Sequence, residues 1–229
     1  MANEDHLAAF DKGLRAWNDW REALGPDIKP DLSDLNLSKA DLSGFNLRDT
    51  LFLDSNLSDA VFIDTLLDGA VLTDCNLRNA NFKGARLLNA VMMNANLEGA
   101  FLAGLFAPGV QFLNARLDGA DLHGSDFTES RFSSASLVGA LLRGSVLRKC
   151  DFERANLSRA DLSGSVLCHA SLVDTLVEGA QFDGAEIGGI SVRNLQGTPQ
   201  SDDNLVLVPK EHGLLTTNGL RSAASRREG

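Results

Sequence analysis

The sequence contains no tyrosine, and aromatic residues make up only 6% of its 229 residues. Proline is also scarce, with five residues, whereas glycine is frequent, with 21. Wide globular cores draw much of their buried area from aromatic side chains. This composition therefore predicts a narrow core and a chain that turns many times.

Long apolar runs are missing as well. The longest candidate, FLAGLFAPGV at 101–110, is too short to cross a bilayer. The amino terminus, MANEDHLAAF, is acidic and lacks the apolar segment of a secretory signal. We therefore expect a cytoplasmic protein that does not enter a membrane.

Motifs that carry chemistry are also missing. The four histidines are isolated, and the sequence has no HxH, CxxC, HExxH, GxSxG or P-loop pattern. The carboxylates have a simpler role as turn or surface residues. The sequence thus predicts no catalytic residue, no metal site and no cofactor.

What the sequence does have is a five-residue period, seen in NLRNANFKGARLLNAVMMNANLEGA at 76–100. The large apolar residues there are Leu77, Phe82, Leu87, Met92 and Leu97. Residues five apart diverge by about 140° around a helix and lie on opposite faces of a strand, so neither element explains them. Gly or Asn follows two residues after each one, and both accept turn conformations. The chain must turn once per unit.

The period runs from Leu32 to Val192, through 33 units without an insertion or deletion. The central position is Leu in 20 units and Phe in 8. The position two residues earlier is Ala, Ser, Thr or Cys in 27 of 32 units, and the position two residues later is Gly, Asp or Asn in 26 of 33. Two inward positions and one turn position therefore repeat together, which is typical of a solenoid.

Three stretches, NLSKADLSGFNL, NARLDGADLHGSDF and RANLSRADLSGSVL, resemble the A(D/N)Lxx units of the pentapeptide repeat protein family. The resemblance covers 31–194 and implies an all-β solenoid, a right-handed quadrilateral β-helix in which four units make one coil. On that reading the repeat makes about eight coils and a rod ~40 Å long.

The segments outside the repeat divide the chain into 1–30, 31–194 and 195–229. Leu7, Phe10, Leu14 and Trp17 recur at helical spacing, which predicts one amphipathic helix that caps the first coil. We expect the oversized inward residues Leu35 and Phe45 to pack against this cap. The last segment predicts a short strand at 205–208 followed by a mobile tail.

Two local features stand apart from the repeat. Cys75 and Cys150 fall at inward positions nearly four coils apart, too far for a disulfide, whereas Cys168 falls at an outward position. In the unit GLFAPG, Ala107 takes the central position and Pro108 follows it. We expect the proline to remove a ladder donor, Leu105 to refill the volume, and the rod to be dented there.

Residues twenty apart in the sequence would stack on one face of the rod. One such face carries an apolar stripe, next to a face that is polar through Asn56, Asn76 and Asn96. An apolar stripe beside a polar one predicts a docking surface, although the carboxy-terminal segment could cover it instead. The stripe consists of Leu51, Leu53, Val71, Val91, Met93 and Leu113.

Charge is uneven along the rod. The net charge is −10, and the segment 31–74 holds nine Asp against two basic residues. Three of these aspartates, Asp34, Asp54 and Asp74, are expected to stack in one column. The column could bind a cationic partner, or its members could simply be turn residues at a solvated corner. The basic residues fall on different columns, so we expect no direct nucleic-acid binding.

We therefore predict a non-catalytic scaffold that binds a protein partner, or a second copy of itself, through an outer face. The family resemblance implies one alternative. Its Qnr and MfpA types are known as DNA-shaped ligands of DNA gyrase that protect the enzyme from drugs or inhibit it. Mimicry of this kind needs negative potential along the rod. Here it is concentrated at one end, and the inserted loops of the Qnr type are missing.

Overall fold

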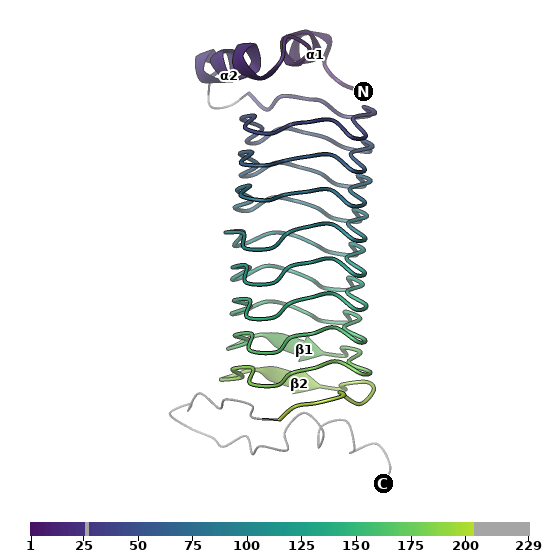
Figure 1. Cartoon of the computed structure of the whole chain (residues 1–229). Helices are drawn as coiled ribbons and strands as arrows, with labels where there is room; N and C mark the ends of the chain where they lie inside the picture. The colour runs from purple at the N-terminus through teal and green to yellow at the C-terminus, as the bar shows by residue number, and fades with distance from the viewer. Residues whose placement is uncertain (26–27, 204–229) are drawn as a thin grey trace.

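The computed structural model describes residues 1–25 and 28–203. Helices α1 (Glu4–Phe10) and α2 (Leu14–Ala23) lie across one end of a tall stack of coils (Figure 1). Near the other end, strands β1 (Ser171–Val173) and β2 (Ser191–Arg193) pair in parallel, with Ser171 opposite Ser191. No helix within the described residues is long and apolar enough to cross a bilayer.

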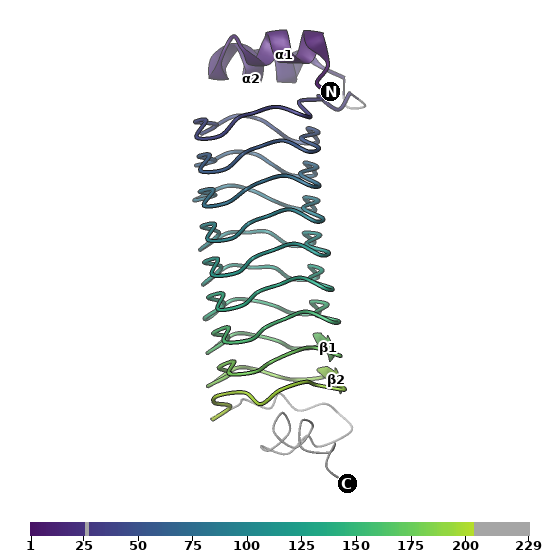
Figure 2. The ribbon, with the colours of Figure 1, turned by 90° about the vertical axis from the view of Figure 1, so that its right-hand side faces the viewer.

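Each coil takes twenty residues. Parallel bridges join residues twenty positions apart, from Asp31 with Leu51 to Gln181 with Ser201. Residues 31 and 201 are 170 positions apart, which is about eight and a half coils, and a coil spacing of ~4.8 Å gives a rod ~40 Å long. Turns recur at every fifth residue, so four units close one coil. Figures 1 and 2 show the resulting straight stack from two sides.

The unit around Leu57 shows why the period is five. Amides of Asn56, Leu57 and Asp59 donate to carbonyls of the coils on either side, at 2.9, 2.7 and 2.7 Å. The amide of Ala60 closes the turn onto the carbonyl of Leu57 at 3.1 Å. The corner residue Asp59 has φ 58°, a left-handed conformation that Gly, Asn and Asp adopt most easily. The amide of Ser58 stays outside the ladder and donates to Oδ1 of Asn56.

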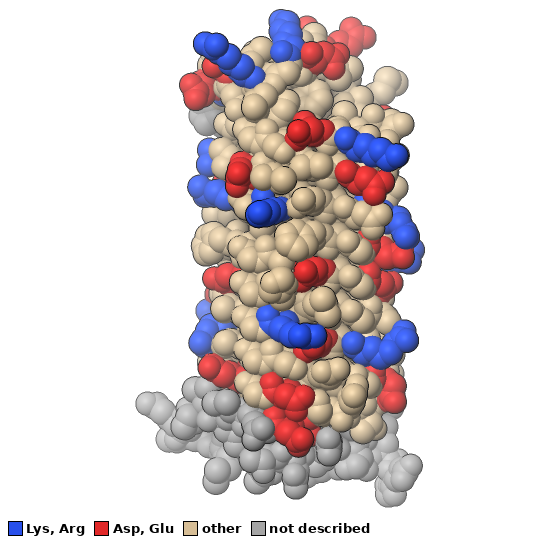
Figure 3. Space-filling model, in the orientation of Figure 1, with Lys and Arg blue, Asp and Glu red and all other residues tan. Residues whose placement is uncertain are grey.

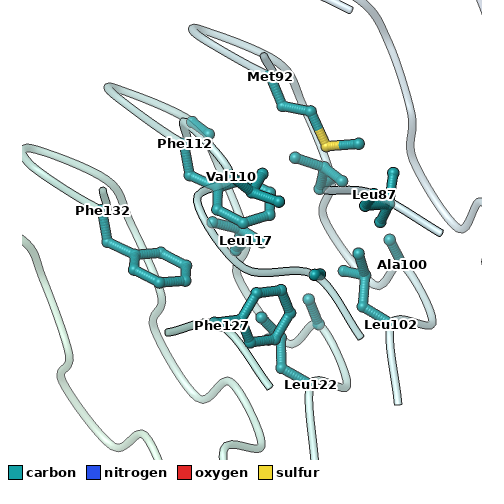
Figure 4. Packing of buried hydrophobic residues seen from close by; sticks show 14 of the residues in the cluster. Leu87, Met92, Ala100, Leu102, Val110, Phe112, Leu117, Leu122, Phe127 and Phe132 are labelled. Atoms are coloured by element: carbon teal, nitrogen blue, oxygen red, sulfur yellow. The ribbon is translucent and has the colours of Figure 1, made fainter. Parts of the chain in front are cut away.

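The core is a column of side chains along the rod axis, as the five-residue period predicts. Phe132 lies between Phe112 and Phe152, with ring centroids 4.9 Å apart on both sides and interplanar angles of 17° and 8°. Figure 4 shows side chains from several coils meeting in this interior. Leu57, Leu77, Leu97 and Leu117 are each fully buried. Small residues at the second inward position let these large ones interdigitate.

Most small polar residues in the described core have hydrogen-bond partners, although the hydroxyls of Ser33 and Ser165 are buried without one. Thr65, Ser145 and Thr175 each donate to the carbonyl that lies 23 residues earlier, at 2.8 Å. That carbonyl belongs to the turn of the preceding coil, where it also faces the interior. These hydroxyls therefore enter a dry core without the cost of an unpaired polar group.

The cap consists of two helices rather than the single helix predicted from the sequence. Gly13 has φ 85°, which interrupts the helical path between α1 and α2. Asn3 caps α1 by accepting hydrogen bonds from the amides of Asp5 and His6. The break lets the rings of Phe10 and Trp17 meet edge to face, with centroids 5.4 Å apart, and it brings Phe10 against Phe45.

The first coil of the rod has no preceding coil to bond, and side chains of α2 bond its backbone groups instead. Trp17 Nε1 donates to the carbonyl of Asn46 at 2.8 Å, and an Arg21 guanidinium nitrogen donates to the carbonyl of Arg48 at 2.7 Å. Asn18 accepts from the amide of Asn46 at 2.8 Å. In the body of the rod, the equivalent groups pair with a preceding coil. The cap thus satisfies ladder groups that an open end would leave exposed.

The unit with Pro108 corrects one prediction. Pro108 occupies the position whose amide never enters the ladder, so it removes no ladder donor, and its carbonyl still accepts from Asn89 at 3.0 Å. Leu105 and Ala107 are both buried, and the phase continues. Within the described coils the ladder is nevertheless loosened here. Arg86 and Phe106 remain bridge partners, yet three nearby amides make no ladder bond of ordinary geometry, those of Gly84, Leu87 and Phe106.

At the other end of the rod, the hydrogen-bond ladder continues past the last residue of the five-residue sequence period. Beyond Asn194, Leu176 still bridges Gln196, and Leu195 is buried. The strand at 205–208 and the tail predicted after it lie outside the described residues.

The cap generates a prediction about stability. Because Trp17 is fully buried and holds a hydrogen bond to Asn46, Trp17→Ala should lower the free energy of unfolding by ~3–5 kcal/mol. Trp17→Phe keeps most of the packing and should cost ~1–2 kcal/mol. Leu14→Ala, at a side chain that is 42% exposed, is the control and should cost under ~1 kcal/mol. Denaturant unfolding followed by circular dichroism measures all three; equal losses would contradict the role of the cap.

Candidate docking faces

Each coil contributes four pairs of outward positions, one pair flanking each large inward residue, and we call each stack of such pairs a face. We name each after a residue of the coil that starts at Leu51: the Leu51 face, the Asn56 face, the Val61 face and the Leu66 face. Successive faces are separated by corners, where the residues with positive φ lie. Side chains twenty apart stack along a face because their backbones are bridged.

The structure brings the six residues of the predicted stripe onto the Leu51 face. Bridges join Leu51 to Val71 and Val71 to Val91, which makes one column over three coils. Leu53, Met93 and Leu113 occupy the other outward position of the same face. Leu53 is 37% exposed, whereas the other five residues are half-buried. The stripe is therefore a shallow apolar surface, interrupted only by Thr73 between Leu53 and Met93.

The Asn56 face beside it is polar over the same coils. Asn56 donates to Asn36, and Asn76 donates to Asn56, both at 3.1 Å. Further along, Arg78 contacts Glu98 at 2.5 Å, and Arg116 approaches the same carboxylate at 3.2 Å. Amide and ion-pair ladders keep this face hydrated. The contrast between the two faces gives the rod a distinct apolar side.

The predicted acidic column lies at the corner next to the Leu51 face. Asp34, Asp54 and Asp74 have φ of 61°, 58° and 60°, as turn residues at this position require. Asp74 accepts a hydrogen bond from Asn94 at 3.0 Å, and the amino terminus of Met1 forms an ion pair with Asp34. The hydrogen bond to Asp34 raises the pKa of the Met1 ammonium. One cation of the chain itself therefore already occupies the end of the column.

Three apolar side chains on other faces are at least as exposed as Leu53. Phe106 on the Leu66 face is 57% exposed, and Phe101 and Leu141 on the Val61 face are 37% and 38% exposed. The five-residue period places all three residues at outward positions, but it does not predict how exposed each one is. The missed signal is the corner residue: Gly139 and Gly144 flank Leu141 and carry no side chain to cover it.

Ion pairs between neighbouring coils break up the surface charge. Arg48 and Arg86 both approach Asp68, at 3.1 and 3.2 Å, from the coils before and after it. Figure 3 shows basic and acidic side chains side by side along one face of the rod. At Asp161, burial acts to raise the pKa, but hydrogen bonds from Ser163 and Arg143 outweigh it and lower the pKa. Positive and negative side chains therefore alternate on this surface, and neither sign dominates it.

The sequence matches the family model described as pentapeptide repeats, in eight copies whose segments together run from residue 31 to residue 174. That span is more than half of the chain. The chain belongs to the pentapeptide repeat family. No curated protein matches it in sequence, and the family and the solved structures that resemble it indicate no catalytic class.

Solved pentapeptide repeat proteins share the fold. HetL, involved in heterocyst differentiation regulation in the cyanobacterium Nostoc sp. strain PCC 7120, is 23% identical over 90% of this chain and 94% of its own, with a TM-score of 0.51. A trypsin-treated form of QnrB1, a plasmid-mediated fluoroquinolone resistance protein, is 17% identical over 79% of this chain and 92% of its own, with a TM-score of 0.62. At these identities the likeness extends to the fold alone.

All three cysteines of this pentapeptide repeat protein are buried. Cys168, expected to be a surface thiol, is only 2% exposed. Arg148, one coil before it, reaches Glu186, one coil after it, at 3.9 Å, and this pair spans the column that holds Cys168. Burial raises the pKa of Cys75 to about 12, and it also raises the pKa of Cys150.

These environments predict thiols that do not react in the folded protein. At pH 8 a water-soluble disulfide reagent should label fewer than one thiol per native chain, and three after denaturation, because the thiolate is the nucleophile. An unfolded thiol ionises near pH 9, but Cys75 stays protonated to about pH 12. The folded state therefore binds more protons above pH 9, and stability should fall as pH rises through this range. Rapid labelling of one or more thiols at pH 8 would contradict this account.

Proposed function

We propose that this protein is a non-catalytic scaffold of the cytoplasm that binds a protein partner through the Leu51 face. The observation that supports the proposal most is the apolar surface formed by Leu51, Leu53, Val71, Val91, Met93 and Leu113, bordered by the hydrated Asn56 face. The right-handed, four-sided cross-section implied by the family is part of the proposal, because it sets which faces adjoin.

Rigidity makes such a shallow surface suitable for binding. The backbone of each unit is held by ladder bonds to both neighbouring coils, so little conformational entropy is lost when a partner docks. Removing a further ~200 Å² of apolar surface from water would contribute ~5 kcal/mol before the cost of association. An extended or flat partner surface fits a face of this kind better than a protruding one.

Two substitutions test the docking face. Leu53→Asp combined with Met93→Asp places two charges on the apolar surface, and we expect the affinity for the partner to fall at least ~100-fold. The matched control is Ser38→Asp with Ser58→Asp, which adds the same charge at equivalent positions of the Asn56 face. The partner is captured with the unaltered protein, identified, purified and titrated by calorimetry against both variants. Equal affinity for the two variants would contradict a role for the Leu51 face.

A second candidate function is binding to DNA gyrase or a related topoisomerase as a mimic of duplex DNA. It is supported by the fold shared with the fluoroquinolone resistance protein QnrB1 and by the acidic segment 31–74. The basic residues paired with these carboxylates weaken the negative potential that mimicry requires.

A gyrase ligand should change supercoiling activity, or its inhibition by a quinolone, at ~1 μM protein. Unchanged activity with gyrases from several bacteria would eliminate this candidate.

A further inference from the structure

The Val61 face carries apolar side chains in every second coil. Val61 and Ile63 lie in one coil, Phe101 lies two coils later, and Leu141 lies two coils after that. The coils between them are polar, with Asn81 and Lys83 in one and Asp121 and His123 in the other. Phe101 and Leu141 are among the most exposed apolar residues of the rod, at 37% and 38%. Along the rod, this pattern is symmetric about Phe101.

The corners that border this face are bare in the later coils and acidic in an earlier one. Beside Phe101, Asp121 and Leu141 both corners are glycine. At five of these six glycines an added Cβ would meet no atom within 4 Å, and at the sixth, Gly99, it would meet the side-chain amide of Asn79. Beside Val61 the corners are Asp59 and Asp64 instead. Another surface can therefore approach the later coils closely. The coil of Val61 carries two exposed carboxylates instead: Asp59 accepts a hydrogen bond from Asn79 at 3.0 Å, and Asp64 lies over the Gly84 corner of the next coil.

A second copy of the chain fits this face when the two rods run antiparallel about an axis at Phe101. Because every coil has the same spacing, Phe101 then meets Phe101, and Val61 meets Leu141 of the second copy. Asp59 and Asp64 lie over the bare corners Gly139 and Gly144. Each copy thus places side chains where the other has none.

Charges match in the same arrangement. Asp64 comes beside Arg143 of the second copy, and Lys83 comes opposite the coil of Asp121 and His123. Arg143 is 64% exposed and keeps donors free beyond those that bind Asp161. His123 is held 2.6 Å from Asp121, and this carboxylate is within reach of a lysine from across the face. Opposite charges at these positions favour one register.

Other arrangements of two copies are less favourable. Parallel rods meeting through this face would place Asp59 against Asp64 of the second copy, so that like charges would meet. An antiparallel pair shifted by one coil would pair apolar coils with polar ones, because the apolar side chains recur only in every second coil. We therefore propose that the protein forms an antiparallel dimer through the Val61 face, with its two-fold axis at Phe101.

The interface is small. The five coils from Val61 to Leu141 span four spacings of ~4.8 Å, or ~19 Å along the rod. An interface one face wide and ~19 Å long buries less surface than a standard stable interface does. The dimer should therefore be reversible, with a Kd on the order of 10–100 μM. The central phenylalanine pair supplies the aromatic anchor that small interfaces depend on. The Leu51 face stays free, so this inference does not depend on the proposed function.

Sedimentation velocity of the full chain from ~1 to ~500 μM tests the dimer. The unaltered protein should shift from monomer to dimer across this range. Phe101→Arg and Phe101→Asp should each remain monomeric, because the residue on the axis meets its own copy and like charges repel. An equimolar mixture of the two variants should recover dimer, since Arg then faces Asp.

Charge reversal gives a second, independent test that leaves the apolar residues unchanged. Lys83→Glu and Asp121→Lys should each weaken the dimer at least ~5-fold, and the chain with both changes should recover it. Phe106→Asp is the matched control. Phe106 is more exposed than Phe101 but lies on the neighbouring face, so this variant should dimerise with an unchanged Kd. The Leu53→Asp and Met93→Asp variant should dimerise as well, which separates this result from the test of partner binding.

Three results would overturn the inference. They are a monomer at every concentration, a dimer that persists in both Phe101 variants, and a mixture of these variants that stays monomeric. Circular dichroism confirms that each variant is folded. If a Phe101 variant fails to fold, the Lys83 and Asp121 reversal decides: recovery in the double variant supports the antiparallel dimer, and no recovery contradicts it.

Discussion

The hydrogen-bond ladder between coils is the constraint on which the rest of the structure depends. Every five residues, three amides bond to neighbouring coils and a fourth closes a turn, as in the unit from Asn56 to Ala60. That pattern leaves two positions facing inward, two facing outward and one at a corner with positive φ. The narrow core, the many glycines and the flat faces all follow from repeating this unit without interruption.

The same constraint accounts for the ends and the irregularities of the rod. A ladder must terminate somewhere, and α2 terminates it with Trp17, Asn18 and Arg21, whose polar atoms bind the first coil. Pro108 is tolerated because it takes the one position whose amide the ladder does not use. The ladder and the core constrain the other positions, so side chains can vary freely only at outward and corner positions. Binding surfaces of this protein therefore consist of residues at those positions.

The spacing of residues predicted the core well and the surface only in part. Leu57, Leu77, Leu97 and Leu117 are buried because periodicity alone decides which way a side chain points. Exposure depends instead on the side chains of neighbouring units. Arg148 and Glu186 pair across the column that holds the buried Cys168, and the glycine corners Gly139 and Gly144 leave Leu141 uncovered. The break at Gly13 was also missed, because the helical spacing of the apolar residues continues across it.

Self-association and partner binding use different faces of one rigid rod in this account, so a dimer would present two Leu51 faces to partners. Both depend on the five-residue ladder. Amide hydrogen exchange measured by NMR tests that ladder most directly. We predict slow exchange at four of every five amides along 32–184, with fast exchange at positions equivalent to Ser58 and at Gly84, Leu87 and Phe106. Protection with a helical period, or none at all, would contradict the account.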